Sequence, residues 1–166
     1  MMLVLTFRMK LRSNYHIGAG YGRGFNVDSA LLRGSDAKPV IRGATLAGLL
    51  RGGAYRLLGL GPLERRGHDR SDVLTRLFGS ADFPKAWQIS TARLVKGSGA
   101  SLIREAEDVQ RVRIDPRVRR AEPGKLFVQE EGLSGSVFRF KIAFLENDEA
   151  VVDDAAFLVA AARFVR

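Results

Sequence analysis

The sequence predicts an α+β fold with elements in the order strand, helix, strand, hairpin, strand, helix. Residues 3–11 and 137–145 alternate between apolar and mostly charged side chains, which is the period of a strand that buries one face. Residues 46–58 and 153–166 instead repeat apolar side chains every three to four positions, as helices do. A length of 166 residues with 46% hydrophobic content suffices for a core, so we expect a single domain over residues 1–166.

Composition and charge narrow the class of protein. The chain has no cysteine, which excludes disulfides and thiolate metal sites and fits a reducing compartment. We find no signal-peptide pattern and no apolar run near the roughly 18 residues that span a bilayer, so we expect a soluble, cytoplasmic protein with no membrane partner. The net charge of +9 is uneven, because residues 1–66 hold eleven Lys or Arg against three acids. One face that follows a polyanion would give this asymmetry, as would a generally arginine-rich, solvated surface.

A glycine-rich loop after the first strand is the first candidate site. Its glycines are Gly18, Gly20, Gly22 and Gly24. Glycine allows positive φ angles and lets the backbone approach a ligand closely. Three aromatic residues alternate here with two basic ones: Tyr15, His16, Tyr21, Arg23 and Phe25. This mixture can stack bases while cations hold phosphates, although each ring could equally pack against the rim of the fold.

The next segment predicts a helix with an accessible N-terminus. Residues 38–41 should be extended, because the residue before a proline avoids the helical region. A helix then begins near Gly43, with its apolar residues on one face: Leu46, Leu49, Leu50, Ala54, Leu57 and Leu58. Free N–H groups and the positive dipole end at Gly43 can receive a phosphate, with Thr45 able to cap or donate. Residues 59–70 predict a loop, in which His68 is solvated, and residues 72–78 a short helix.

The second half predicts a strand at 87–95, ended by the glycines of 97–99, and then a long basic hairpin. Two strand-like runs, 109–114 and 125–128, flank a tip that contains Asp115-Pro116 and Pro123-Gly124. The exposed positions of this hairpin are basic: Arg111, Arg113, Arg117, Arg119 and Arg120. They are too many for a core, which indicates a projecting basic arm.

A last helix should begin at a cap formed by Asp153 or Asp154. Its apolar stripe would be Phe157, Ala160, Ala161 and Phe164. The order of elements then matches a modified ferredoxin-like (RRM-like) βαββαβ unit that lacks its final strand. We expect a longer chain or another chain to supply that strand.

Several short motifs follow one another along the chain. HIGAG at 16–20 is followed by an isolated Asp28 and LLRG at 31–34, then by PVIRGATLAGLLR at 39–51 and LFG at 77–79. The later run RVRIDPRVRRAEPGKLFVQEE occupies residues 111–131. In this order they resemble the RAMP proteins of CRISPR–Cas systems, specifically the backbone-forming subunits of type III effector complexes. The resemblance covers residues 3–145 and departs from the family pattern at Arg42 and Ala47, where proline and lysine are usual.

The resemblance implies a fold that polymerises along a CRISPR guide RNA with copies of itself or related subunits. It implies that a thumb hairpin, at about residues 107–126, inserts between guide and target RNA, and that Asp28 cuts the target RNA. The segment from Gly43 to Arg51 would hold guide phosphates. The residues from which we expect RNA contacts are His16, Gly18, Gly20, Arg23, Arg33, Arg42, Gly43, Thr45, Arg51, Arg111, Arg113, Arg117, Arg119 and Arg120.

A lone Asp28 in a basic loop has two chemical routes to RNA cleavage. It can hold Mg²⁺ or Mn²⁺ with phosphate and water completing the shell, or it can position a 2′-hydroxyl for in-line attack. Without the resemblance, Asp28 reads as a turn-capping aspartate beside Ser29. Two alternatives stay open: a catalytically silent structural RAMP subunit, and a stand-alone guide-processing endoribonuclease with His16 as general base.

Overall fold

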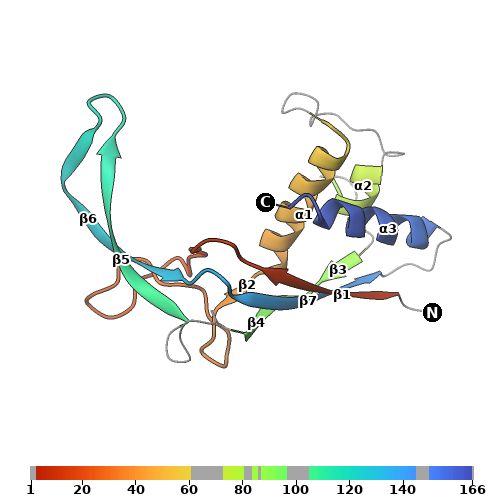
Figure 1. Cartoon of the computed structure of the whole chain (residues 1–166), viewed down its shortest axis with the longest axis horizontal. Coiled ribbons are helices and arrows are strands. Elements are labelled where there is room, and N and C mark those ends of the chain that lie inside the picture. The colour runs from red at the N-terminus through yellow and green to blue at the C-terminus, as the bar shows by residue number, and fades with distance from the viewer. Residues whose placement is uncertain are drawn as a thin grey trace. The chain divides into compact units, whose positions relative to one another are not determined.

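The computed structural model describes residues 3–60, 73–80, 84–85, 87–96, 105–144 and 150–165 (Figure 1). The predicted loop beyond Leu60, with His68, and the glycine break at 97–99 lie outside these residues. The chain divides into two compact units. We call residues 1–7, 42–92 and 140–166 the helical unit, and residues 8–41 and 93–139 the hairpin unit. The prediction of a single domain stays a prediction.

The larger sheet confirms the α+β class. Its strands are β1 (Val4–Lys10), β2 (Val40–Ile41), β3 (Trp87–Ile89), β4 (Ala92–Lys96) and β7 (Val137–Phe144). They pair in the order β1-β7-β4-β2, and β3 also pairs with β7. The last strand in sequence thus lies between the first strand and β4, which is the split βαβ arrangement of a ferredoxin-like unit.

The strand predicted at 87–95 is two strands, and that prediction was wrong in this detail. β3 and β4 both pair antiparallel with β7, but one residue is inserted between them, since Ile89 faces Ile142 whereas Arg93 faces Arg139. At the insertion, the N–H of Lys141 donates to the Ser90 hydroxyl at 2.9 Å. The side chain of Ser90 thus takes a hydrogen bond that a strand backbone would otherwise accept, and the strand bulges there.

Three helices belong to the helical unit: α1 (Gly43–Leu57), α2 (Val73–Phe78) and α3 (Ala150–Ala162). Figure 1 shows them together on one side of β3. Ala54, Leu74 and Ala161 are buried where the three meet. The apolar face of α1 is narrower than predicted, because Leu49 and Leu58 are 36% and 43% exposed while Gly53 is buried. Among the described residues, no helix is long and apolar enough to cross a membrane.

The start of α3 also differs from the prediction. The helix begins at Ala150, so neither Asp153 nor Asp154 is its cap. Asp154 is instead buried, and its two carboxylate oxygens accept hydrogen bonds from Arg76 of α2. The buried residues of α3 are Asp154, Ala155, Leu158 and Ala161, whereas Phe164 is 42% exposed. An acid that looked like a cap from its position in the sequence is instead a buried carboxylate paired with the partly exposed Arg76.

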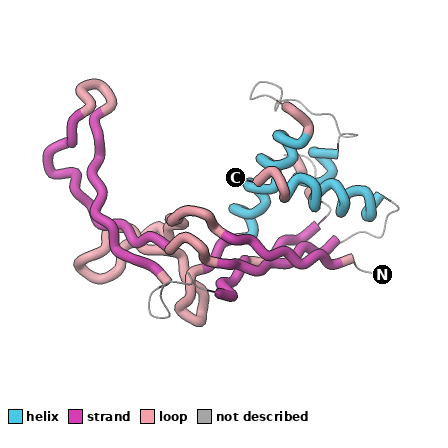
Figure 2. Tube along the Cα trace, in the orientation of Figure 1, coloured by secondary structure: helices cyan, strands magenta, loops and turns pink. Residues whose placement is uncertain are grey.

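The predicted hairpin is confirmed, with a tighter tip than expected. It consists of β5 (Ala106–Asp115) and β6 (Arg120–Gly132), which pair antiparallel. Asp115 faces Arg120, so Pro123 and Gly124 are not part of the tip. They lie in a bulge of β6, where the register shifts between Val112 and Ile114 and Gly124 has a φ of 68°. The hairpin bends along its length in Figure 2.

Candidate nucleic-acid interface

The glycine-rich loop is an ordered structure that pairs with the base of β6. Tyr15 and Gly132 exchange both backbone hydrogen bonds, at 2.9 and 2.7 Å. Ser29 forms a parallel bridge with Gln129, and Gly18 forms an antiparallel bridge with Leu31. Figure 2 shows loop residues gathered around the base of the hairpin. The two segments that the sequence marked as separate candidate sites, the loop and the hairpin, therefore form one surface of the hairpin unit.

The glycines of the loop serve two different purposes. Gly20 and Gly24 have φ angles of 89° and 60°, which side-chain-bearing residues rarely adopt. Gly18 and Gly22 are needed for close approach: a Cβ at Gly22 would lie 2.3 Å from the Val27 carbonyl oxygen, and one at Gly18 would lie 2.9 Å from Nε2 of His16. The expected positive φ is therefore found at two of the four positions.

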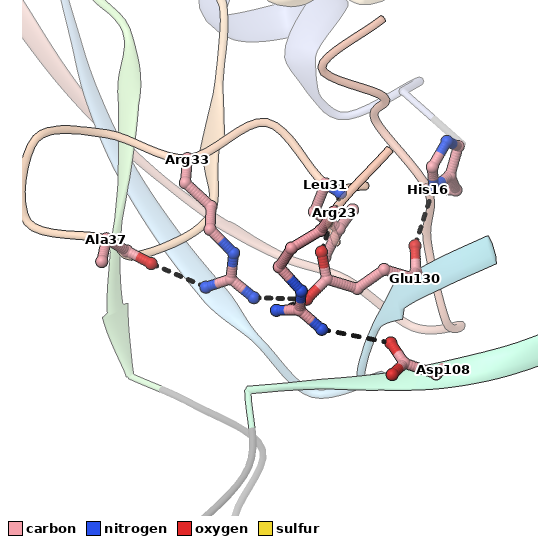
Figure 3. Close-up of polar contacts among 7 residues, drawn as sticks. All are labelled: His16, Arg23, Leu31, Arg33, Ala37, Asp108 and Glu130. Carbon is pink, nitrogen blue, oxygen red and sulfur yellow. Dashed lines mark hydrogen bonds and ion pairs between the residues drawn. The ribbon is translucent and has the colours of Figure 1, made fainter. Parts of the chain in front are cut away.

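Glu130 of β6 lies beneath this surface and is contacted by several residues of the loop (Figure 3). Its side chain is only 2% exposed. Its Oε1 accepts hydrogen bonds from Arg33 at 2.6 Å and Arg23 at 3.0 Å, and its Oε2 accepts the N–H of Leu31 at 2.9 Å. Burial alone would raise the pKa of the Glu130 carboxyl, but these hydrogen bonds and the two guanidinium charges hold it below its usual value. One buried carboxylate thus ties three points of the loop to the hairpin.

The arginines predicted to bind RNA from this loop have internal partners. Arg33 spans Glu130 and the carbonyl of Ala37, 2.6 Å away, and its side chain is 29% exposed. Arg23 lies between Glu130 and Asp108, and its side chain is 53% exposed. Arg23 can therefore still reach a ligand at the surface, whereas Arg33 mainly holds the loop together.

Both ring nitrogens of His16 are also engaged. Nδ1 donates to the backbone carbonyl of Glu130 at 2.7 Å, because a carbonyl can only accept. Nε2 then carries the lone pair of the neutral ring, and the Ser29 hydroxyl donates to it at 3.0 Å. A general base needs that lone pair, so this geometry favours a structural role for His16.

Tyr15 packs inside the hairpin unit. Its ring is edge-on to Phe138 at 5.6 Å between centroids and lies directly against Gly132. Burial raises the pKa of Tyr15 to about 12. Of the three aromatic residues that could either stack on bases or pack against the rim, Tyr15 packs inside, and Tyr21 and Phe25 are at the surface with exposures of 69% and 108%.

Asp28 lies at the surface, beside β6. Its Oδ2 accepts the N–H of Val128 at 2.7 Å, and its own N–H donates to the Val128 carbonyl at 2.9 Å. Oδ1 has no hydrogen-bond or ion-pair partner among the described residues, and the residue is exposed. No cluster of three or more His, Cys, Asp or Glu that could hold a metal occurs in the described ranges. The carboxylate fits a divalent cation that takes one protein ligand and fills its shell with water and phosphate.

The hairpin arginines are all exposed, and they fall into two groups. Arg111 pairs with the buried Glu131, and Arg113 lies 3.4 Å from Glu122. The second group surrounds the turn of the hairpin, and its members have no side-chain hydrogen bond or ion pair with another described residue: Arg117, Arg119 and Arg120. We call these three residues the tip arginines. Their charges are free to meet an anion.

The hairpin also exposes an apolar strip. Val112 faces Leu126 across the two strands, and Ile114 lies just beyond the register shift, opposite Ala121. The exposed fractions are 44% for Val112, 66% for Leu126 and 51% for Ile114. A strand pair that exposes apolar side chains among its arginines is suited to contact a partner.

The other predicted RNA contacts lie in the helical unit. Arg42 precedes α1, no side chain caps the helix, and its first turn holds no acidic residue. Thr45 is therefore exposed without capping, which corrects one of its two predicted roles. A Cβ at Gly43 would lie 2.5 Å from the Ile89 carbonyl oxygen, so this glycine allows α1 to start against β3. Arg51 donates to the carbonyl of Gly79 at 2.8 Å, and its guanidinium lies over the ring of Phe78. These contacts give Arg51 a structural role inside the helical unit.

Sequence reasoning missed Glu130. Two consecutive glutamates after the strand-forming run 126–128 were the available signal, since an acid on the inner face of a strand needs a cationic partner. Its partner Arg33 lies 97 positions earlier, so the pairing itself could not be read from the sequence.

Comparison with known proteins gives a consistent result. A model of the RAMP superfamily matches residues 8–165. The fold is similar to a chain of the type III-B Cmr-β complex solved by cryo-EM with cognate target RNA bound, with a TM-score of 0.68, 11% identity, and coverage of 90% of this chain and 87% of that chain. It is also similar to a chain of the apo state of Cmr-β, with a TM-score of 0.68, 12% identity, and coverage of 94% and 89%. No curated protein matches the chain.

Proposed function

The chain belongs to the RAMP superfamily, and from this premise we propose that it is an RNA-binding backbone subunit of a type III-like CRISPR effector complex. Its partners are a CRISPR guide RNA, a target RNA and other effector subunits, including copies of itself or related RAMP proteins. The similar Cmr-β chain comes from a complex bound to target RNA, which supports this assignment. The observation that carries it is the basic hairpin with its free tip arginines.

The tip arginines provide the charge for RNA binding. Three guanidinium groups that have no side-chain partner in the described part of the chain stand around one turn, and each can hold a phosphate through two parallel hydrogen bonds. Behind them the apolar strip of Val112, Ile114 and Leu126 is exposed, which suits contact with nucleobases. The uncapped start of α1 adds backbone N–H groups for guide phosphates. The hairpin reads the backbone and shape of the RNA, and base pairing between guide and target reads the sequence.

The salt dependence of RNA affinity tests this role. Each phosphate contact on a single strand adds about 0.7 to the slope of log affinity against log salt, so Arg117→Gln should lower the slope by that amount. Replacing all three tip arginines by Gln should lower it by about 2. Arg163→Gln, an exposed arginine after α3, serves as the matched control and should leave the slope unchanged. An unchanged slope in the triple variant would remove the hairpin tip from the RNA interface.

We further propose that Asp28 supports metal-dependent cleavage of the target RNA. The Val128 N–H donates to Oδ2, which orients the carboxylate, and Oδ1 has no partner among the described residues. Through Oδ1, Asp28 would hold Mg²⁺ or Mn²⁺, which supplies positive charge against the scissile phosphate when it is bound. The same oxygen can alternatively accept a 2′-hydroxyl and align it for in-line attack. The hairpin beside it would separate the flanking nucleotides.

A cleavage assay on the assembled complex tests the catalytic part. The variant is Asp28→Asn, because its amide oxygen still accepts the Val128 N–H while the charge is lost. We expect periodic cuts in the target RNA with Mg²⁺ or Mn²⁺, their loss in Asp28→Asn, and unchanged RNA affinity. Asp36→Asn, at another exposed acid of the same segment, is the control and should cut normally. Cutting that persists in Asp28→Asn would make the chain a structural subunit and assign catalysis to a partner.

A further inference from the structure

Phe25 is the most exposed large apolar side chain described in the chain, with a relative exposure of 108%. It stands at the middle of a turn of three residues that is closed by the Arg23 N–H donating to the Val27 carbonyl at 2.8 Å. Tyr21, before the turn, is 69% exposed. A phenylalanine in this position loses the free energy of burial, so its exposure calls for a partner outside the chain.

The turn holds Phe25 at a defined place. Val27, two residues after it, is 5% exposed and anchors the turn, and the N–H groups of Asp28 and Ser29 both donate to the Val128 carbonyl. On the other side, the close contact of Gly22 with the Val27 carbonyl fixes how the two arms of the turn meet. The ring is thus presented by a braced turn, three positions from Asp28.

The relative exposure of 108% means that the rest of the chain leaves both faces of the Phe25 ring accessible. The neighbouring Gly24 adds no side chain beside it. Arg23, at the start of the turn, keeps 53% of its side chain exposed. A flat ring with open faces next to an accessible cation matches the combination that binds single-stranded nucleic acid.

A nucleobase fits this arrangement better than a protein surface does. A stable protein interface buries about 800 Å² on each partner, far more than one ring on a turn can offer. A base needs only the area of the ring, and its own phosphate can meet Arg23.

We propose that Phe25 stacks on a nucleobase of the RNA that is bound beside Asp28, and that Tyr21 offers a second stacking surface. This inference rests on the proposed RNA-binding function and adds to it the residue that positions the nucleotide near Asp28. Stacking holds the base while the backbone at the next phosphate stays accessible to the carboxylate.

Tryptophan fluorescence of the full chain tests the proposal directly. The chain has one tryptophan, Trp87, which is fully buried, so Phe25→Trp adds a single exposed fluorophore. Titration with poly(U), an unstructured RNA, should quench most of the added emission if the ring stacks on bases. Val152→Trp places the same fluorophore on α3 at a side chain that is 71% exposed, and its emission should not change.

Binding measurements complete the test. Phe25→Ala should weaken poly(U) binding about tenfold, Phe25→Leu nearly as much, and Phe25→Tyr should restore it, because stacking needs an aromatic ring. The stacking proposal fails if Phe25→Ala binds poly(U) normally and the emission of Phe25→Trp is not quenched. The proposed function still stands in that case, provided that the salt slope of poly(U) binding depends on the tip arginines. If the native chain does not bind RNA, the proposed function fails first. Emission from Phe25→Trp that changes with protein concentration alone would identify a contact between copies and overturn the proposal.

Discussion

Replacing Glu130 by Gln should loosen the glycine-rich loop without unfolding the helices. The carboxylate accepts bonds from Arg33, Arg23 and the Leu31 N–H, and Gln can keep only part of this set because its amide nitrogen is a donor. The bond from Arg33 is charge-assisted and largely buried, which is worth roughly 1.5–3 kcal/mol. Arg23 is half exposed and adds at most about 1 kcal/mol. We expect Glu130→Gln to destabilise the loop by about 3 kcal/mol.

Hydrogen exchange followed by mass spectrometry measures this change locally. A loss of about 3 kcal/mol should speed exchange of backbone amides in residues 15–33 by about two orders of magnitude. Glu122→Gln is the matched control, because its partner Arg113 is 69% exposed and the pair contributes little. Residues 43–57 of α1 give an internal reference. If residues 15–33 exchange at the same rate in Glu130→Gln and Glu122→Gln, Glu130 does not hold the loop.

The same pair gives a pH dependence with a defined sign. The folded state lowers the pKa of Glu130 below its ordinary value of 4.5. Its contribution to stability is therefore present above that value and is lost as the pH falls through the folded pKa. Protection of residues 15–33 in the native chain should decrease on acidification, and should change less in Glu130→Gln. The two proteins should converge in acid, and a difference that widened there would contradict the assignment.

Two further predictions concern the packing around Gly132 and the ion pair of Asp154. Gly132→Ala would place a Cβ 2.1 Å from the Tyr15 ring, which is confined by Phe138, so it should lower the free energy of unfolding by about 2 kcal/mol or more in a urea titration. Asp154→Asn weakens the ion pair between α3 and Arg76 and should cost about 1.5 kcal/mol, since the Arg76 side chain is 40% exposed and can be solvated when the charge of its partner is lost. The loss is read from Trp87 emission during unfolding, because Trp87 lies in the same unit against Phe78. The exposed Asp153→Asn should cost almost nothing, and equal effects of the two aspartates would refute the assignment.

The sequence predicts those elements whose signal is local. The alternation of residues 3–11 and 137–145 placed β1 and β7 within a residue or two, and the glycine at 43 marked the start of α1. These predictions needed only the period of the side chains and the chemistry of one turn. They also needed no knowledge of which strand lies beside which.

The missed features depend on partners far along the chain. The bulge at Ser90 exists because Lys141 of β7 donates to its hydroxyl. Pro123-Gly124 has turn composition, but pairing of Asp115 with Arg120 closes the hairpin earlier and leaves this dipeptide in a bulge. Asp154 looked like a cap because its partner Arg76 could not be seen in the sequence. Local propensity and tertiary pairing disagree at these points, and the pairing decides.

The bulge in β6 has a consequence for association between copies of the chain. A long two-stranded hairpin with an apolar strip offers backbone N–H and C=O groups to which a strand of another molecule could add. Pro123 lacks the N–H that such pairing needs, and Gly124, with its positive φ, takes the backbone out of the extended conformation. A strand approaching β6 could therefore stay in register over only one of the two segments on either side of the bulge. The feature that reshapes the hairpin therefore also protects the edge of β6 from strand addition by another molecule.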